Sequence, residues 1–215
     1  MESNDEDFFL ENMNNIYVIK IGGSVLLTRR NKLDEYRIAC IAEQVSSMRN
    51  AGIGVVLIVS GAVGCGSAFV DVKQDIMSRR LSAGIGQAYL TSTFYEKFKE
   101  KGLTIAQILL KSDDFLISDL SRLIKSYIEL GIIPIFNEND VLQLNSFKGN
   151  DYLGAEVALA LNANKFIMLS TMKGSAYGVG GGIAKQIVIN LLKQKHVDAT
   201  IVNGKVKNII LKTIL

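Results

Sequence analysis

Histidine and cysteine, which enzymes often use as bases and nucleophiles, are scarce in this sequence. The two cysteines, Cys40 and Cys65, lie far apart and fit neither a CxxC motif nor a metal-ligand spacing. We therefore expect a reducing, cytoplasmic location and no protein-bound metal. The single histidine, His196, follows Lys193 and Lys195, which is typical of a solvated helix end. The composition gives no support to a cysteine- or histidine-based mechanism.

Long apolar runs and strong charge are absent as well. No run approaches the roughly 18 to 20 apolar residues of a membrane span, and the acidic residues 1–15 resemble neither a signal peptide nor a transit peptide. Lys and Arg number 24 against 21 Asp and Glu, a net charge of +3 with no basic tract. We expect an acidic tail over 1–15, a single domain over 16–215, and neither a membrane nor a nucleic-acid partner.

Strand and helix patterns alternate along the chain. Short apolar, β-branched runs indicate strands, and apolar residues spaced by three and four indicate helices. This alternation predicts an α/β fold with a mostly parallel central sheet between helix layers, a three-layer αβα sandwich. Pro134, the only proline, predicts that its strand lies at an edge of the sheet or is irregular. The expected strands are 16–21, 54–59, 104–110, 132–136, 165–169, 198–202 and 208–211, with a hairpin arm at 141–147, and the expected helices are 34–50, 78–99, 117–127, 151–163 and 184–194.

Glycine-rich turns follow the first two of these strands. Residues 18–26 read VIKIGGSVL and place Lys20 two residues before the first glycine, and residues 60–66 read SGAVGCG. Glycine lets backbone amides approach a phosphate because no Cβ intervenes. Parallel sheets bind ligands beyond the carboxyl ends of their strands. One such turn is more often only a turn, but two at successive strand ends favour a phosphate site.

Three charged residues near strand ends or helix starts have more than one interpretation. Lys20 lies at the end of a buried strand, where a structural role for a cation is hard to find. Asp151 is either a helix N-cap or a functional carboxylate beside Asn150. Lys185 is either a surface lysine or a cation near an anionic ligand, because the first turn of a helix otherwise disfavours positive charge.

In their order and spacing the motifs resemble the amino-acid kinase superfamily, and most closely its glutamate 5-kinase family. The resemblance extends over residues 17–202 and implies the amino-acid kinase fold. The matching stretches are 18–26 (VIKIGGSVL), 58–66 (IVSGAVGCG), 83–90 (AGIGQAYL), 106–115 (AQILLKSDDF), 131–141 (GIIPIFNENDV), 149–158 (GNDYLGAEVA) and 178–185 (GVGGGIAK).

The resemblance implies ATP-dependent phosphorylation of the side-chain carboxylate of L-glutamate, giving γ-glutamyl phosphate in the first step of proline biosynthesis. It implies that Lys20 and Lys185 stabilise the transferring phosphoryl group while Asp151 orients both lysines. Mg²⁺ would be carried by the nucleotide. The resemblance further assigns Ser60, Gly61, Ala62, Asn137 and Asn150 to the substrate, and Gly22, Gly23, Ser24, Ser170, Thr171, Lys173, Gly181 and Gly182 to the nucleotide.

Three positions depart from the family pattern. Gly149 stands where the family usually has an aspartate. Ser170 and Thr171 follow the strand that the family ends in Thr-Asp, and residues 175–177 replace a segment of several tens of residues. The expected nucleotide-binding lobe is therefore shortened.

These departures leave two alternatives to a glutamate 5-kinase open. One is a degenerate family member that binds a small ligand or regulates a partner, and the other is a kinase for a different small acid. A homodimer or homotetramer is expected as well, because the small residues Gly84, Gly86 and Ala88 within a helix suggest close helix packing, with a dimer interface as one location.

Overall fold

The computed structural model describes residues 15–72, 75–116, 119–171 and 182–214. The expected tail at 1–15 therefore lies almost entirely outside the described residues. The described strands are β1 (Ile16–Ile21), β2 (Gly54–Val59), β3 (Ile105–Leu110), β4 (Ile133–Glu138), β5 (Lys165–Ser170) and β6 (Asp198–Asn203). All are parallel and form one sheet in the order β3-β4-β2-β1-β5-β6, which confirms the predicted α/β class. β1 is central, between β2 and β5.

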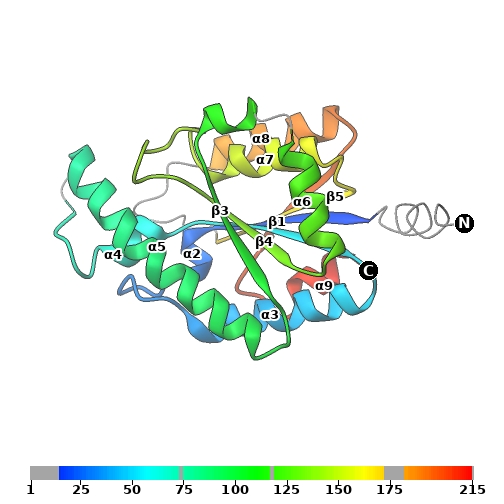
Figure 1. Cartoon of the computed structure of the whole chain (residues 1–215), viewed down its shortest axis with the longest axis horizontal. Helices are drawn as coiled ribbons and strands as arrows, with labels where there is room; N and C mark the ends of the chain where they lie inside the picture. Colours follow the sequence, from blue (N-terminus) through cyan, green and yellow to red (C-terminus); the bar gives the residue numbers. More distant parts are fainter. Residues whose placement is uncertain (1–14, 73–74, 117–118, 172–181, 215) are drawn as a thin grey trace, which may run out of the picture.

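Helices cover both faces of this sheet (Figure 1). They are α2 (Gly23–Leu26), α3 (Glu35–Asn50), α4 (Ala62–Gly66), α5 (Ile76–Lys99), the 3-10 helix η1 (Ser112–Leu116), α6 (Leu120–Glu129), α7 (Asn150–Ala160), α8 (Gly182–Gln194) and α9 (Ile209–Ile214). On one face α6, α7 and α8 bury apolar side chains against the sheet, and on the other α3, α5 and α9 do so. This is the predicted three-layer arrangement. Among the described helices, none has the length and apolar character needed to cross a membrane.

Strand alternation decides which helix layer each side chain of β1 and β4 faces. Val18 packs in the core shared with α6, α7 and α8, whereas Ile19 packs in the core shared with α3 and α5. Lys20 has the same parity as Val18, so its side chain lies on the α7 side of the sheet. By the same alternation, Asn137 at the end of β4 faces α5, and Glu138 faces α7.

Pro134 does not mark an edge strand, because β4 lies between β3 and β2. The N–H of Ile133 donates to the carbonyl oxygen of Thr104, just before β3 (2.9 Å). The next backbone nitrogen, that of Pro134, therefore faces β2. The ladder between β2 and β4 begins only at the pair Leu57 and Ile135, so the proline precedes it and removes none of its hydrogen bonds. The edge interpretation is wrong, and the pairing is irregular at the proline.

Two of the expected β segments are not strands. Residues 141–147 form turns, and there Asp140 Oδ1 accepts a hydrogen bond from the N–H of Asn145 (3.0 Å). Such local side-chain acceptors compete with strand pairing. Residues 208–211 enter α9 instead, whose Ile210 is fully buried. A short apolar run does not by itself distinguish a strand from a buried helix.

Of the small residues predicted to allow close packing on α5, Gly86 packs against α4 of the same chain, whereas Gly84 lies near Val141 and Ala88 is exposed. A Cβ on Gly86 would overlap the carbonyl oxygen of Ala62, and a Cβ on Gly66 would overlap that of Ser82. The two helices therefore approach more closely than side chains would allow. Because α4 follows β2 directly, this packing fixes the turn that contains Gly61. The close packing is confirmed within the chain, and the dimer stays a prediction.

Candidate active site

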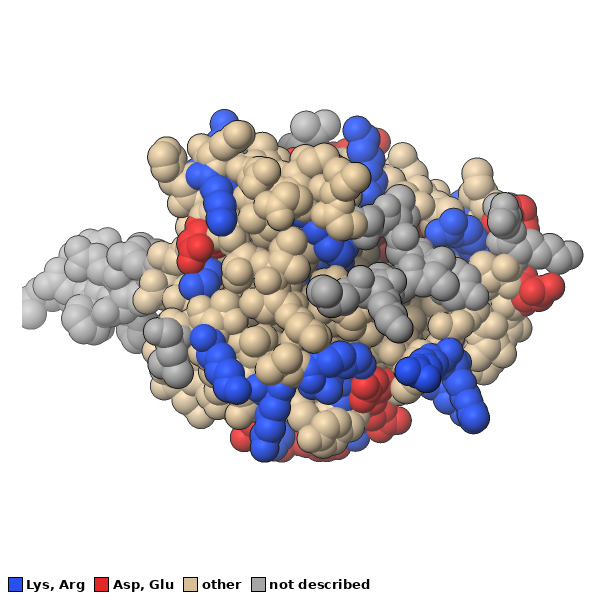
Figure 2. Space-filling model, turned by 180° about the vertical axis from the view of Figure 1, so that it is seen from behind, with Lys and Arg blue, Asp and Glu red and all other residues tan. Residues whose placement is uncertain are grey.

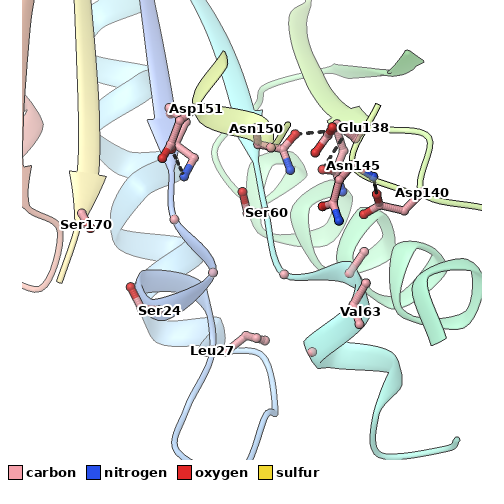
Figure 3. Close-up of a pocket in the computed structure, with 18 of the residues that line it drawn as sticks. Ser24, Leu27, Ser60, Val63, Glu138, Asp140, Asn145, Asn150, Asp151 and Ser170 are labelled. Carbon is pink, nitrogen blue, oxygen red and sulfur yellow. Dashed lines mark hydrogen bonds and ion pairs between the residues drawn. The ribbon is translucent and has the colours of Figure 1, made fainter. Parts of the chain in front are cut away.

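A cavity of about 340 Å³ opens at the carboxyl ends of β1, β2, β4 and β5, where a parallel sheet binds its ligands. Figure 3 shows its lining, with Asp151 and Ser170 toward one end and Glu138 and Asp140 toward the other. The structure brings together thirteen of the predicted site residues here. They are Lys20, Gly22, Gly23, Ser24, Ser60, Gly61, Ala62, Asn137, Asn150, Asp151, Ser170, Thr171 and Lys185.

The remaining three predicted site residues differ in position. Lys173 and Gly181 lie outside the described residues. Gly182 begins α8 and is exposed, but it does not contribute to the lining of the cavity. Its predicted role at the nucleotide is therefore not supported by its position.

Asp151 lies between the two predicted catalytic lysines. Lys20 Nζ is 2.5 Å from Asp151 Oδ1, and Lys185 Nζ is 2.6 Å from Asp151 Oδ2. Lys20 and Asp151 are buried, with exposed fractions of 5% and 4%. Two cations thus share one carboxylate in a site that is largely closed to water, where charges act over short distances with little screening.

Burial and charge act in opposite directions on this cluster. Burial lowers the pKa of Lys20, and the nearby charge of Asp151 counteracts that effect. Burial alone would raise the pKa of Asp151, but Lys20 and Lys185 hold that pKa below its ordinary value. Asp151 is therefore ionised at neutral pH.

The local sequence explains how the cluster is assembled. Gly149 precedes α7 with φ of +113°, a backbone conformation that residues with side chains rarely adopt. This lets the chain enter α7 with Asp151 in its first turn, facing the end of β1. The N-cap position belongs to Gly149, so the interpretation of Asp151 as an N-cap is wrong. Its carboxylate contacts the lysines instead.

In the first glycine turn, residues 22–24, the backbone amide of Gly22 does not have the predicted role at the nucleotide. The N–H of Gly22 donates to the carbonyl oxygen of Leu169 in β5 (2.9 Å), so this amide is not directed at a phosphate. Gly23 and Ser24 form the first turn of α2 and line the cavity; backbone amides in a first turn have no acceptor within the helix. The second turn contains Gly61, whose φ of +113° requires glycine.

Two asparagines and a buried glutamate connect the end of β4 to α5 and to the start of α7. Asn137 Nδ2 donates to Gln87 Oε1 on α5 (2.6 Å), and Asn150 Oδ1 accepts from the N–H of Glu138 (3.1 Å). Glu138 Oε1 in turn accepts from the N–H of Phe147 (2.8 Å). Burial raises the pKa of Glu138 to about 7. This network fixes the loop that leads into Asn150 and Asp151.

Sequence reasoning missed several lining residues. Glu138 and Asp140 lie within the matching stretch 131–141, close to the predicted substrate residue Asn137. Arg79, near the start of α5, has no comparable signal because no glycine turn or strand end lies beside it. The further lining residues are Leu27, Thr28, Arg29, Asn31, Val63, Gly64, Asn145, Lys148, Gly149, Tyr152 and Ala184.

The chain matches the model of the amino acid kinase family over residues 15–174 and belongs to that family. Among curated proteins, the glutamate 5-kinase of Clostridium acetobutylicum is 34% identical over 180 residues, which cover 80% of this chain and 67% of the relative. That of Prochlorococcus marinus (strain MIT 9301) is 37% identical over 166 residues, covering 73% and 46%. Delta-1-pyrroline-5-carboxylate synthase A of Arabidopsis thaliana is 30% identical over 207 residues, covering 84% and 29%. The predicted resemblance is confirmed, and the relatives support a kinase.

Solved structures agree on the fold. An isopentenyl phosphate kinase superimposes with a TM-score of 0.67 at 17% identity, over 93% of this chain and 96% of that chain. The UMP kinase of Ureaplasma parvum superimposes with a TM-score of 0.64 at 14% identity, over 93% and 94%. At these identities the likeness concerns the fold alone.

The chain is shorter than its curated relatives. It spans between 29% and 67% of the length of the three proteins named above. The alignment with the glutamate 5-kinase of Bacteroides thetaiotaomicron has 232 positions, more than the 215 residues of the whole chain. That relative therefore contains segments with no counterpart here, and the place of the shortening, between β5 and α8, stays a prediction.

Proposed function

We propose that this protein is an ATP-dependent carboxylate kinase that phosphorylates the side chain of L-glutamate to γ-glutamyl phosphate, the first step toward proline. The observation that carries the proposal is the pair of lysines, Lys20 and Lys185, held by Asp151 at the cavity. Glutamate 5-kinases among the relatives, at up to 37% identity, support this substrate.

The two-lysine cluster suits phosphoryl transfer. The transferred group carries charge spread over three oxygens, and catalysis depends mainly on positioning and on nearby positive charge. Lys20 and Lys185 contact different oxygens of the Asp151 carboxylate. They would therefore flank a phosphoryl group from two sides. The attacking atom is a carboxylate oxygen of the substrate, which is already ionised at neutral pH. No general base is therefore needed.

The substrate and the nucleotide are proposed to bind at opposite ends of the cavity. Ser60, Gly61, Ala62, Asn137 and Asn150 would hold the acceptor, with the carboxylate of Asp140 able to receive its ammonium group. On the other side, Gly23 and Ser24 together with Ser170 and Thr171 would contact ATP. Lys173 and Gly181 remain proposed nucleotide contacts from the family pattern.

Magnesium, which the kinase family implies, is proposed to bind on the nucleotide phosphates. Both oxygens of Asp151 face lysines, so this carboxylate does not suit a cation. Within the described ranges there is no group of three or more His, Cys, Asp or Glu side chains arranged to hold a metal. When bound, the ion would neutralise charge on the phosphate oxygens, and the protein would hold the phosphates with its lysines and backbone amides.

The proposal is tested by measuring ADP release from Mg-ATP with and without L-glutamate, with Lys20→Ala as the control. We expect glutamate-dependent ADP release that the substitution abolishes. No glutamate-dependent turnover, together with no ATP binding by calorimetry, would support the degenerate, regulatory alternative, which the missing segments favour. Turnover with a different small acid alone would identify a kinase of changed specificity.

A homodimer or homotetramer in the cytoplasm is also part of the proposal. On α5, Met77, Leu81, Ile85 and Tyr89 recur at intervals of four and are exposed, so they form an apolar stripe along the helix. Phe69 stacks on Tyr89 with ring centroids 4.9 Å apart, which extends the stripe. Sedimentation velocity of the purified chain tests the oligomer directly.

A further inference from the structure

A partly buried cation that lines the cavity has no role in the proposed mechanism. Among the residues that the structure describes, five Lys or Arg side chains line the cavity. Lys20 and Lys185 share Asp151, and two others, Arg29 and Lys148, are exposed. Arg79 of α5 is half-buried, and its guanidinium is the charge that the proposed phosphoryl transfer leaves unexplained.

The Nε–H of Arg79 is buried and has no hydrogen-bond partner within the described part of the chain. A buried donor without an acceptor costs free energy, and such groups in native proteins usually have a reason. Arg79 lies close enough to Asp140 for its positive charge to lower the pKa of that carboxyl, which burial raises. Asp140 lies at the end of the cavity away from Ser170 and Asp151 (Figure 3). Arg79 therefore places a guanidinium beside the Asp140 end.

We propose that Arg79 binds a second carboxylate of the acceptor and thereby makes the site selective for a dianionic acid. The proposal rests on the proposed function, since it assigns the far end of the same substrate. A guanidinium can donate two parallel hydrogen bonds to a carboxylate, which fixes both charge and orientation. One carboxylate of the acceptor then meets the lysine cluster, while the α-carboxylate meets Arg79. Glutamate has both carboxylates, together with an ammonium group that suits Asp140.

Three acids, used as phosphoryl acceptors, distinguish carboxylate binding by Arg79 from a purely structural role of this residue. L-Glutamate has two carboxylates and an ammonium group, glutarate has the two carboxylates alone, and 4-aminobutyrate lacks the α-carboxylate but keeps the rest. We compare kcat/KM for the three acids in the wild-type protein, Arg79→Gln and Arg79→Lys. The control is Arg122→Gln, which removes the same charge from an exposed side chain of α6.

For Arg79→Gln we expect kcat/KM to fall about 10- to 100-fold for glutamate and for glutarate, mainly through KM, as is typical of a lost hydrogen bond to a charged group. The value for 4-aminobutyrate should change less than about threefold. Arg79→Lys should recover part of the loss because it restores the charge without the fork geometry. The Arg122→Gln control should match the wild type for all three acids.

An equal loss for all three acids would show that Arg79 supports the fold and would overturn the proposal, as would no loss relative to the control. If Arg79→Gln does not fold, as judged by thermal unfolding, Arg79→Lys decides between the same outcomes. If the wild-type protein phosphorylates none of the acids, the proposed function fails. Calorimetric binding of glutamate and 4-aminobutyrate to the wild-type and Arg79→Gln proteins then tests the role of Arg79 separately: weaker binding of glutamate alone supports it, and any other pattern overturns it.

Figure 2 shows the opposite side of the molecule from Figure 1, with Lys and Arg side chains scattered over it among uncharged residues. No single basic patch dominates this face. The charge on this face therefore does not by itself indicate an anion site, whereas the partly buried Arg79 lines the cavity.

Discussion

At the scale of single residues, the central feature is one carboxylate shared by two lysines. Asp151 forms ion pairs with Lys20 and Lys185 through different oxygens, so each lysine depends on it for its position. The sequence could predict these three residues because each lies beside a recognisable motif. It could not predict that the amide of Gly22 is taken by β5, since that depends on which strand lies alongside β1.

We expect Lys20→Met and Lys185→Met each to lower kcat about 10²- to 10³-fold, because each removes a cation that faces the transferring group. Steady-state kinetics with ATP and glutamate measures the effect. Lys193→Met, which changes an exposed lysine of α8, is the matched control and should retain the wild-type kcat. Equal activity of the Lys20 and Lys193 variants would contradict the assignment.

Asp151→Asn should be less stable than Lys20→Met. The asparagine leaves two lysines close together without a counter-charge, which costs about 3–5 kcal/mol when the charges are buried. The methionine leaves Asp151 still paired with Lys185. Urea denaturation at pH 7 gives both free energies of unfolding, and similar values for the two variants would show that the cluster is more solvated than its burial implies.

Glu138 should make the stability of the protein depend on pH. Burial raises its pKa from 4.5 to about 7. Between these values the folded chain keeps a proton that the unfolded chain loses, so stability falls as pH rises through this window and then levels off. Relative to Glu138→Gln, the wild type should lose about 2 kcal/mol between pH 5 and pH 8. Urea denaturation of both proteins measures this difference. If the free energies of unfolding of the two proteins changed with pH in the same way, Glu138 would not be a buried, protonated group at low pH.

At the scale of elements, glycines allow α4 and α5 to pack closely against each other. Gly86→Ala should lower the free energy of unfolding by about 1–3 kcal/mol, because its Cβ would overlap the carbonyl oxygen of Ala62. It should also raise KM for glutamate by displacing the turn at Gly61. Thermal unfolding and kinetics measure the two effects.

Gly84 provides the matched control on the same helix. A Cβ there would lie 3.4 Å from a side-chain carbon of Val141, an ordinary contact. Gly84→Ala should therefore be neutral or stabilising by up to about 1 kcal/mol, since alanine favours a helix over glycine. If Gly84→Ala and Gly86→Ala destabilised the protein equally, the close approach of α4 and α5 would not be the reason for glycine at position 86.

The elements also show where sequence patterns are sufficient. The bounds of β1 and β2 follow directly from their apolar runs, and α3 begins where Asp34 accepts a hydrogen bond from the N–H of Arg37 (3.0 Å). The patterns fail in two situations: where secondary structure is decided by packing against residues far away in the sequence, and where it is decided by nearby polar side chains. Residues 208–211 become a helix because they pack under the sheet, and residues 141–147 turn because nearby side chains bind their backbone.

At the scale of the whole molecule, the parallel sheet explains why residues far apart in sequence meet. Its strand order brings the carboxyl ends of β1, β2, β4 and β5 to one edge, so Lys20 and Lys185 face the same carboxylate. The sequence predicts that the motifs gather at this edge. It does not predict Arg79, because that position depends on how the start of α5 lies beside the cavity.

The most direct test of the account is to trap the product. Incubation with Mg-ATP, L-glutamate and hydroxylamine converts an acyl phosphate into a hydroxamate, which mass spectrometry identifies. We predict γ-glutamyl hydroxamate in amounts equal to the ADP released, and neither product above background with Lys20→Met. ADP release without hydroxamate, or no glutamate-dependent product of either kind, would contradict the assignment of this site to carboxylate phosphorylation.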